Sequence, residues 1–203
     1  FDGLFGVFAD SLPDGWGRLL VDRMLLKNHI DPASLNCLDR LAIAGDTAMG
    51  ALTYRPKKLF QNKKVNLTLD ELSEECAKVL NEKPADSLDS LFVLGGSSGG
   101  ARPKILTEVD GENWLIKFPS TYDPADIGLQ EYRYTLCAGK CGITVPKVKL
   151  FPSERCAGYF GSKRFDRNGQ DRIHMLSVSA LLEVSHRIPN LDYDSLMRLT
   201  LQL

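Results

Sequence analysis

The chain has 203 residues, of which 43% are hydrophobic and 25% are charged, as in an ordinary globular protein. Its 25 basic and 26 acidic side chains leave a net charge of -1, which argues against the strongly basic surface of a direct nucleic-acid binder. No apolar run approaches the roughly 18 residues of a membrane-spanning helix, so we expect no membrane contact.

The first region, residues 1–86, is predicted to be a small, mostly helical domain. A helix is expected to start at Pro13, and a short helix followed by a strand that stops at Pro56 is expected further on. Thr68, with Glu71 three residues later, has the spacing of a capping box and predicts the start of an amphipathic helix. No pattern in this region indicates catalytic chemistry.

The second region, residues 87–170, is predicted to combine antiparallel strands with one helix. Alternating apolar residues flank Asp110–Gly111, a pair that is typical of a tight β-hairpin turn. A helix is expected to begin after Asp123–Pro124 and to end near Gly142. Two further strands are expected in the segments TVPKVKLF and CAGYFGSKRFDR.

The third region, residues 171–203, is predicted to hold two helices, in the segments SVSALLEVSHRI and DYDSLMRLTLQL. The whole chain is therefore expected to belong to the α+β class. It starts at Phe1 without a methionine and stops at Leu203 inside an apolar run. We therefore expect it to be a piece of a longer protein.

Five cysteines are scattered along the chain, and the odd number argues against a disulfide framework. They are Cys37, Cys76, Cys137, Cys141 and Cys156. This usage suits a reducing compartment, so we expect a cytoplasmic location. Cys137 and Cys141 stand four residues apart on an expected helix, a spacing that a metal pair could also have. Because no histidine or second cysteine pair completes a ligand set, we expect buried thiols and no metal site.

The decapeptide GGSSGGARPK, residues 95–104, is the segment that most strongly indicates function. Backbone N–H groups that no side chain obstructs can fold around an anion such as phosphate. No GK[ST] follows, which excludes a Walker loop, whereas a strand, a glycine-rich turn and a second strand form the arrangement of protein kinases. A flexible linker is the alternative on this segment alone.

Two later residues agree with a kinase-like site. Lys117 lies within the apolar segment WLIKFP, where burial would require a partner, and Glu131 lies on the helix that follows. In kinases, a strand lysine holds the nucleotide phosphates and pairs with such a glutamate. The alternatives are that strand alternation turns Lys117 to water and that Glu131 is a solvated helix carboxylate.

Motifs spread through nearly the whole chain resemble the HipA-like family: FGVFADSLPDGWGRLL, LDRLAIAGDTAMGAL, GGSSGGARPK, WLIKFP, GYFGSKRFDR and RIHMLSVSALL. The resemblance implies a serine/threonine protein kinase, with a kinase-like N-lobe over residues 87–170 and the start of a helical C-lobe after it. It also implies a toxin of a toxin–antitoxin system, neutralised by a HipB-like DNA-binding antitoxin. Contact with DNA would then be indirect, and the protein substrates of the family include an aminoacyl-tRNA synthetase.

The resemblance also assigns roles to individual residues. Ser97 matches the serine that family members autophosphorylate, and Ser98 is an adjacent hydroxyl that could take this role. Phosphate on this loop would add about two negative charges beside an anion site and so expel the loop. Lys117 matches the phosphate-binding lysine. The residues implied to bind ATP are Gly99, Gly100, Ala101, Arg102, Lys104, Lys117, Lys163, Arg164 and Phe165.

The last three of these residues come from the segment KRFDR, which matches the hinge that frames the adenine. Family members often carry an acidic residue where Lys163 stands, so the backbone rather than this side chain would make the contact. Without the resemblance, Phe165 would be interpreted as a core residue, and Asp166–Arg167 as an ion pair in a turn.

Phosphate transfer also needs an aspartate that orients the substrate hydroxyl and ligands for Mg²⁺. The family supplies them from a stretch similar to DGHxKN, which this sequence lacks. We therefore expect ATP and Mg²⁺ to serve the parent kinase, with the catalytic aspartate beyond Leu203 and no transfer by this chain alone. The alternative hypothesis is a catalytically inactive short or split homologue, which would act as a regulatory, antitoxin-binding protein through residues 1–86.

Overall fold

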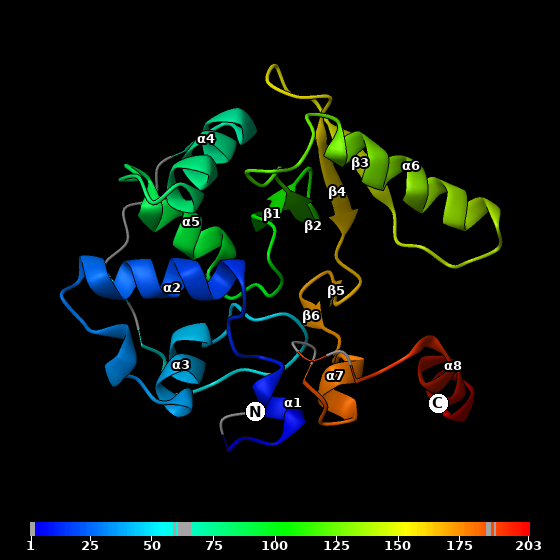
Figure 1. Ribbon diagram of the computed structural model, residues 1–203, viewed down its shortest axis with the longest axis horizontal. Coiled ribbons are helices and arrows are strands. Elements are labelled where there is room, and N and C mark those ends of the chain that lie inside the picture. The colour runs from blue at the N-terminus through cyan, green and yellow to red at the C-terminus, as the bar shows by residue number, and fades with distance from the viewer. Residues whose placement is uncertain (1–2, 59, 61–65, 186–187, 189) are drawn as a thin grey trace.

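A computed structural model describes residues 3–58, 60, 66–185, 188 and 190–203, and it shows an antiparallel sheet with helices on both sides (Figure 1). The helices that precede the sheet are α1 (Gly6–Ala9), α2 (Trp16–Lys27), α3 (Cys37–Ala44), α4 (Leu69–Leu80) and α5 (Leu88–Gly95), with a 3-10 turn at Pro32–Ser34. This arrangement confirms the predicted α+β class.

The four-stranded sheet has the order β1-β2-β4-β3, and each neighbouring pair is antiparallel. Its strands are β1 (Lys104–Val109), β2 (Glu112–Lys117), β3 (Val148–Phe151) and β4 (Tyr159–Lys163), and α6 (Ile127–Lys140) connects β2 to β3. In the β1–β2 turn, Asp110 and Gly111 both have positive φ, 53° and 74°, as a type I′ turn requires. The predicted hairpin and the predicted helix after it are both confirmed.

Side-chain alternation gives this sheet two different faces. One face packs against α2, α4 and α5 and forms the main hydrophobic core with them (Figure 1). The residues that the sheet and the end of β2 contribute to this core are Ile105, Trp114, Ile116, Phe118, Phe151 and Tyr159. The other face carries Lys104 and Lys117, which are directly opposite each other on β1 and β2.

Helix α4 ties the first predicted region to the sheet. It begins with the predicted capping box, in which Thr68 and Glu71 bond each other's backbone N–H groups. Asp70, in its first turn, accepts hydrogen bonds from the Ser153 hydroxyl (2.6 Å) and the Tyr159 hydroxyl (2.7 Å). The main core thus includes residues on both sides of position 86, and a domain boundary there stays a prediction.

The strand predicted to stop at Pro56 is wrong. The chain instead folds back on α3, where the Tyr54 N–H donates to the Gly45 carbonyl (2.9 Å) and the Lys58 N–H donates to the Ala42 carbonyl (2.9 Å). Backbone bonds to the end of α3 therefore hold this segment, and no strand of the described residues pairs with it. Helix α2 also begins at Trp16, three residues later than predicted, because Gly15 before it adopts φ +49°.

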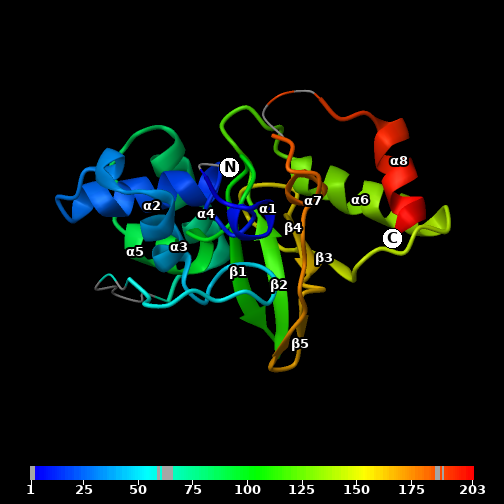
Figure 2. The same cartoon turned by 90° about the horizontal axis from the view of Figure 1, so that it is seen from below.

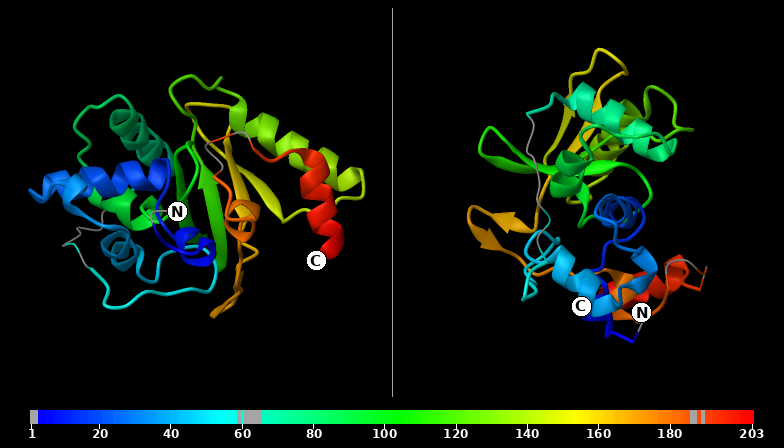
Figure 3. Two further views of the ribbon diagram at one scale, coloured as in Figure 1. Left: turned by 60° about the horizontal axis from the view of Figure 1, so that its bottom comes forward. Right: turned by 90° about the vertical axis from the view of Figure 1, so that its left-hand side faces the viewer.

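The C-terminal part of the described chain returns to the N-terminus. It contains the small hairpin of β5 (Arg167–Asn168) and β6 (Asp171–Arg172), then α7 (Val178–Leu181) and α8 (Tyr193–Gln202). Helix α7 lies beside α1, as Figures 2 and 3 show. Here the Asp10 carboxylate accepts hydrogen bonds from the Ser177 hydroxyl (2.6 Å) and N–H (2.7 Å).

Both predicted C-terminal helices are present, but α7 is a single turn. Its predicted continuation includes residues 186 and 187, which lie outside the described residues. Within the described part of the chain, no helix is both long enough and apolar enough to cross a membrane.

Candidate functional site

An ion pair joins strand β2 to helix α6. The Lys117 ammonium contacts the Glu131 carboxylate, and the two side chains are 30% and 27% exposed. The Lys117 ammonium also lies 5.4 Å from the centre of the Phe160 ring, a distance at which the ring attracts a cation. The structure thus brings together the two residues that the kinase pattern pairs, and neither is an isolated solvated charge.

A second ammonium lies next to this pair. The Lys104 side chain faces Lys117 across the β1–β2 ladder, and the residue is only 6% exposed. Burial, followed by repulsion from Lys117, lowers the pKa of Lys104 to about 8, although the charges of Glu131 and Asp14 work against this shift. Two neighbouring ammonium groups in a partly dry site favour an incoming anion.

The glycine-rich stretch reaches this site as the connection from α5 to β1. A helix therefore precedes it, which differs from the strand that precedes the glycine-rich turn in protein kinases. Residues 88–95 form a helix because their apolar side chains bury one helical face, with Leu91 fully buried against the main core. The glycine-rich turn leads into β1, which is the first strand of the β1–β2 hairpin.

The start of α2 holds the glycine-rich stretch in place. The Trp16 N–H donates to the Gly100 carbonyl (2.9 Å). A Cβ atom on Gly17 would overlap the Ser98 carbonyl, so this close approach of two backbones requires glycine at position 17.

Free space surrounds the tip of the stretch. A Cβ atom added to Gly99 would meet nothing within 4 Å, and one added to Gly100 would meet only the Lys104 ammonium, at 3.3 Å. Within the described ranges, the N–H groups of Gly99, Gly100 and Ala101 donate to no protein acceptor. Free amides beside two ammonium groups are groups that can bind phosphate oxygens once they are directed toward them.

The two serines of the stretch have different environments. Ser98 is completely buried, and its hydroxyl donates to the Gly95 carbonyl (2.6 Å). Ser97 is only partly buried, and its hydroxyl donates to the Thr47 carbonyl (2.8 Å). In this conformation, Ser97 is therefore the serine that a phosphate donor could reach.

Arg102 does not extend freely from the loop. Its Nε and Nη2 atoms each donate to the Asp123 carboxylate at 2.9 Å, which also accepts the Ser120 N–H at 2.9 Å. This bidentate pair anchors the end of the loop to the segment before α6. The sequence offered no sign of it beyond a proline-flanked aspartate.

The three predicted hinge residues point in different directions. Lys163 is paired with Trp114 on the core face of the sheet, and its ammonium donates to Glu112 (2.8 Å), so this side chain is not part of the site. Phe165 is 61% exposed, which shows that its interpretation as a core residue is wrong. Arg164 is buried, and its backbone N–H donates to the Asn113 carbonyl (2.8 Å).

Asp166 is the fully buried centre of a charged network. It accepts hydrogen bonds from Arg164 (2.9 and 2.7 Å), from Arg167 (2.8 Å) and from the Gly50 N–H (2.8 Å). Burial alone would raise the pKa of Asp166, but the bonds from Arg164 and Gly50 outweigh it and hold the pKa below its ordinary value. The predicted turn ion pair is therefore a buried link to the segment near Gly50.

A cavity of about 230 Å³ lies on the Ser97 side of the stretch. Its wall includes Ser97, Leu106 and the guanidinium-bearing residues Arg164, Arg167 and Arg172. Among the described residues, the buried Nη1 atom of Arg172 has no hydrogen-bond partner. No local pattern in the sequence indicates Arg172, because its neighbours come from a hairpin and a turn that are far apart in the chain.

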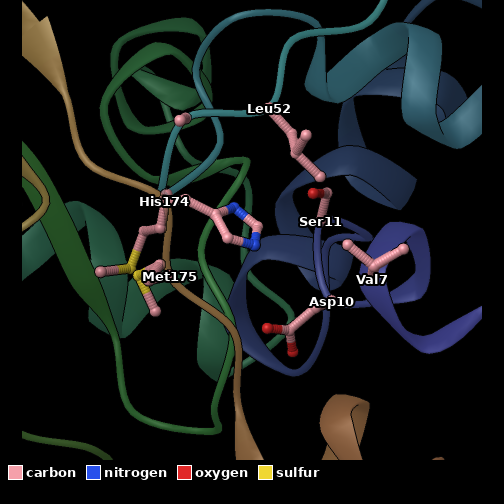
Figure 4. A pocket seen from close by; sticks show the side chains of 8 residues that line it. Val7, Asp10, Ser11, Leu52, His174 and Met175 are labelled. Carbon is pink, nitrogen blue, oxygen red and sulfur yellow. The ribbon is translucent and has the colours of Figure 1, made fainter.

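A smaller cavity of about 20 Å³ lies between α1 and the segment that follows β6 (Figure 4). Figure 4 shows the His174 ring directed toward Ser11 and Asp10. None of the residues predicted to bind ATP lines this cavity, and its volume is close to that of a single water molecule. It is a packing feature between the two ends of the described chain.

Two family models match this chain. The family model for the HipA N-terminal domain matches residues 1–55, and that for the HipA-like C-terminal domain matches residues 96–203, more than half of the chain. The chain belongs to the HipA family. A search of the curated proteins returns no match. In this HipA-family chain, the C-terminal match contains Lys104, Lys117 and Glu131.

Kinases in general need a metal site, and the described residues of this chain do not fit one. Among them, no group of three or more histidine, cysteine, aspartate or glutamate side chains is placed to hold an ion. The carboxylates of Glu131 and Asp123 beside the site already pair with cations. Cys137 and Cys141 are both exposed, so the predicted burial of this pair is wrong; the buried residue of α6 is Gly128, near the other end of the helix.

Proposed function

We propose that this HipA-family chain binds ATP on the sheet face that carries Lys104 and Lys117, as the nucleotide-binding part of a serine/threonine protein kinase. The observation that supports the proposal best is the meeting of two ammonium groups with the unpaired amides of the glycine-rich stretch. Lys117 would hold the phosphates while Glu131 orients it. The backbone beside Arg164 would frame the adenine.

Transfer of the phosphoryl group is part of the same proposal for the parent protein. Bound Mg²⁺ would neutralise the phosphate charge, but no described residues can be assigned to it, and the catalytic aspartate is proposed to lie beyond Leu203. Ser97 is the proposed autophosphorylation site, since Ser98 is buried. Mass spectrometry of the parent protein should find phosphate on this loop, and Ser97→Ala should remove it.

The proposed partners follow from the family and not from a surface of this chain. A HipB-like antitoxin would bind the protein and carry any contact with DNA. The protein substrate would be an aminoacyl-tRNA synthetase or another protein with an accessible serine or threonine. A net charge of -1 agrees with indirect rather than direct contact with DNA.

Titration of the chain with ATP, by calorimetry, tests the proposed binding. Loss of a hydrogen bond to a charged group costs about 1.5–3 kcal/mol, so Lys117→Met should weaken ATP binding by roughly 10- to 100-fold. Lys149→Met is the matched control, because Lys149 lies on β3 with its ammonium over the Phe151 ring, away from the site. Equal ATP affinity in all three proteins would refute the proposed site.

A further inference from the structure

The buried ammonium of Lys104 has an unusual set of acceptors. It donates to the Gly99 carbonyl (2.5 Å) and the Gly100 carbonyl (3.2 Å), both from the glycine-rich stretch. Lys117, its neighbour across the ladder, instead pairs with a carboxylate. Lys104 is therefore a nearly buried cation whose bonded acceptors are neutral peptide oxygens, while its neighbour is bonded to an anion.

These two contacts set the orientation of the loop peptides. The Gly100 carbonyl accepts both from Lys104 and from the Trp16 N–H, so the peptide is fixed between β1 and the start of α2. With the carbonyl oxygens of residues 99 and 100 directed toward Lys104, the dipoles of these peptides present their negative ends to the ammonium. A phosphate at the same ammonium would meet those oxygens and be repelled.

We propose, on the basis of the proposed phosphate site, that Lys104 is a positioning residue which holds the glycine-rich stretch closed until a phosphate group displaces the Gly99 and Gly100 carbonyls from its ammonium. A phosphate oxygen is the stronger acceptor, because both partners of the new bond are charged. The peptide whose carbonyl belongs to Gly99 can then rotate and direct the Gly100 N–H toward the phosphate, whereas the Gly100 carbonyl keeps its bond from the Trp16 N–H. Glycine permits this rotation at low steric cost.

The charged groups around Lys104 are consistent with this exchange. They are Lys117 on β2, Glu131 on α6 and Asp14 before α2. The Lys117 charge repels Lys104, and the Glu131 carboxylate is already bonded to Lys117. The pKa of Lys104, about 8, also implies that raising the pH above this value weakens its hold on the carbonyls without any ligand.

Carbonyl ¹³C resonances of Gly99 and Gly100 report this contact directly. We would assign them in the isotope-labelled chain, then add inorganic tripolyphosphate as the probe. In the ligand-free protein, Lys104→Met should shift both resonances in the direction of a lost hydrogen bond, and Lys149→Met should leave them unchanged. Tripolyphosphate should shift them the same way in the unsubstituted chain, and so should titration through pH 8.

The outcomes separate this inference from the proposed function. If tripolyphosphate shifts the Lys117 side chain and the loop amides but leaves both carbonyls unchanged, the phosphate site stands and the role of Lys104 is refuted. If it shifts no resonance of the loop or of Lys117, the proposed function itself is refuted, and the release step with it. If the carbonyl resonances shift neither in Lys104→Met nor with pH, Lys104 does not hold the loop.

Discussion

Substitution of Asp166 by asparagine is expected to destabilise the protein severely, although the shape of the side chain hardly changes. Asp166 is fully buried, and its carboxylate bonds the guanidinium groups of Arg164 and Arg167, whose side chains are only 8% and 11% exposed. In Asp166→Asn, the negative charge is lost and one acceptor oxygen becomes a donor. Both arginines then lose their counter-charge although their side chains are almost completely buried.

The magnitude follows from the cost of breaking a buried pair. Removal of one partner of a buried ion pair costs about 3–5 kcal/mol, because the remaining charge is left uncompensated. Domains are stable by only about 5–15 kcal/mol, so Asp166→Asn should remove a large part of the total. At about 2–4 °C per kcal/mol for a chain of this size, the midpoint of thermal unfolding should fall by roughly 6–20 °C.

Urea unfolding followed by circular dichroism measures this loss. The matched control is Asp194→Asn, which removes an exposed pair with Arg198, whose side chains are 75% (Arg198) and 71% (Asp194) exposed. An exposed pair contributes about 1 kcal/mol at most. If Asp166→Asn costs no more free energy of unfolding than this control, then the network around Asp166 is not the structural link that we infer.

Three further predictions concern the glycine-rich stretch. Gly100 adopts φ +79°, so Gly100→Ala should cost about 1–2 kcal/mol of stability in thermal unfolding, and an unchanged midpoint would contradict this. Gly99→Ala should fold normally, since its Cβ meets nothing within 4 Å, yet its methyl group should weaken ATP binding in calorimetry by obstructing the phosphates. Because the folded pKa of Lys104, about 8, lies below its ordinary value of 10.5, the folded state releases this proton first, and stability should rise with pH between these two values. Comparison with Lys104→Met in urea unfolding isolates the effect, and identical pH profiles for the two proteins would count against it.

Sequence patterns correctly predicted the elements whose formation depends on a few neighbouring residues. The Asp110–Gly111 turn, the capping box at Thr68 and the helix after Asp123–Pro124 each depend on backbone angles or hydrogen bonds inside one short segment. The strand predicted before Pro56 failed because strand formation needs a neighbouring strand, which no local pattern supplies. Helix α5, before the glycine-rich stretch, was not predicted, although its apolar spacing is helical.

Some features of the candidate site were likewise indicated by the sequence, and others were not. The order of glycine-rich stretch, strand lysine and helix glutamate pointed to Lys117 and Glu131, and tertiary folding brings them together. The contact of Lys104 with the loop carbonyls had no signal in the sequence, because it depends on how the stretch folds over β1. The direction of Lys163, on the core side of the sheet, depends on the register of β4 against β2.

By itself, the sequence determined the α+β class, the hairpin, the helix of Glu131 and the glycine-rich stretch, because each of these depends on the residue types in one continuous segment. Only the tertiary structure decided which charges meet: Lys104 with peptide oxygens, Lys117 with Glu131, and Asp166 with two arginines. The physical reason is that the energy of a charge depends on burial and on partners a few ångströms away, and those partners come from segments far apart in the chain.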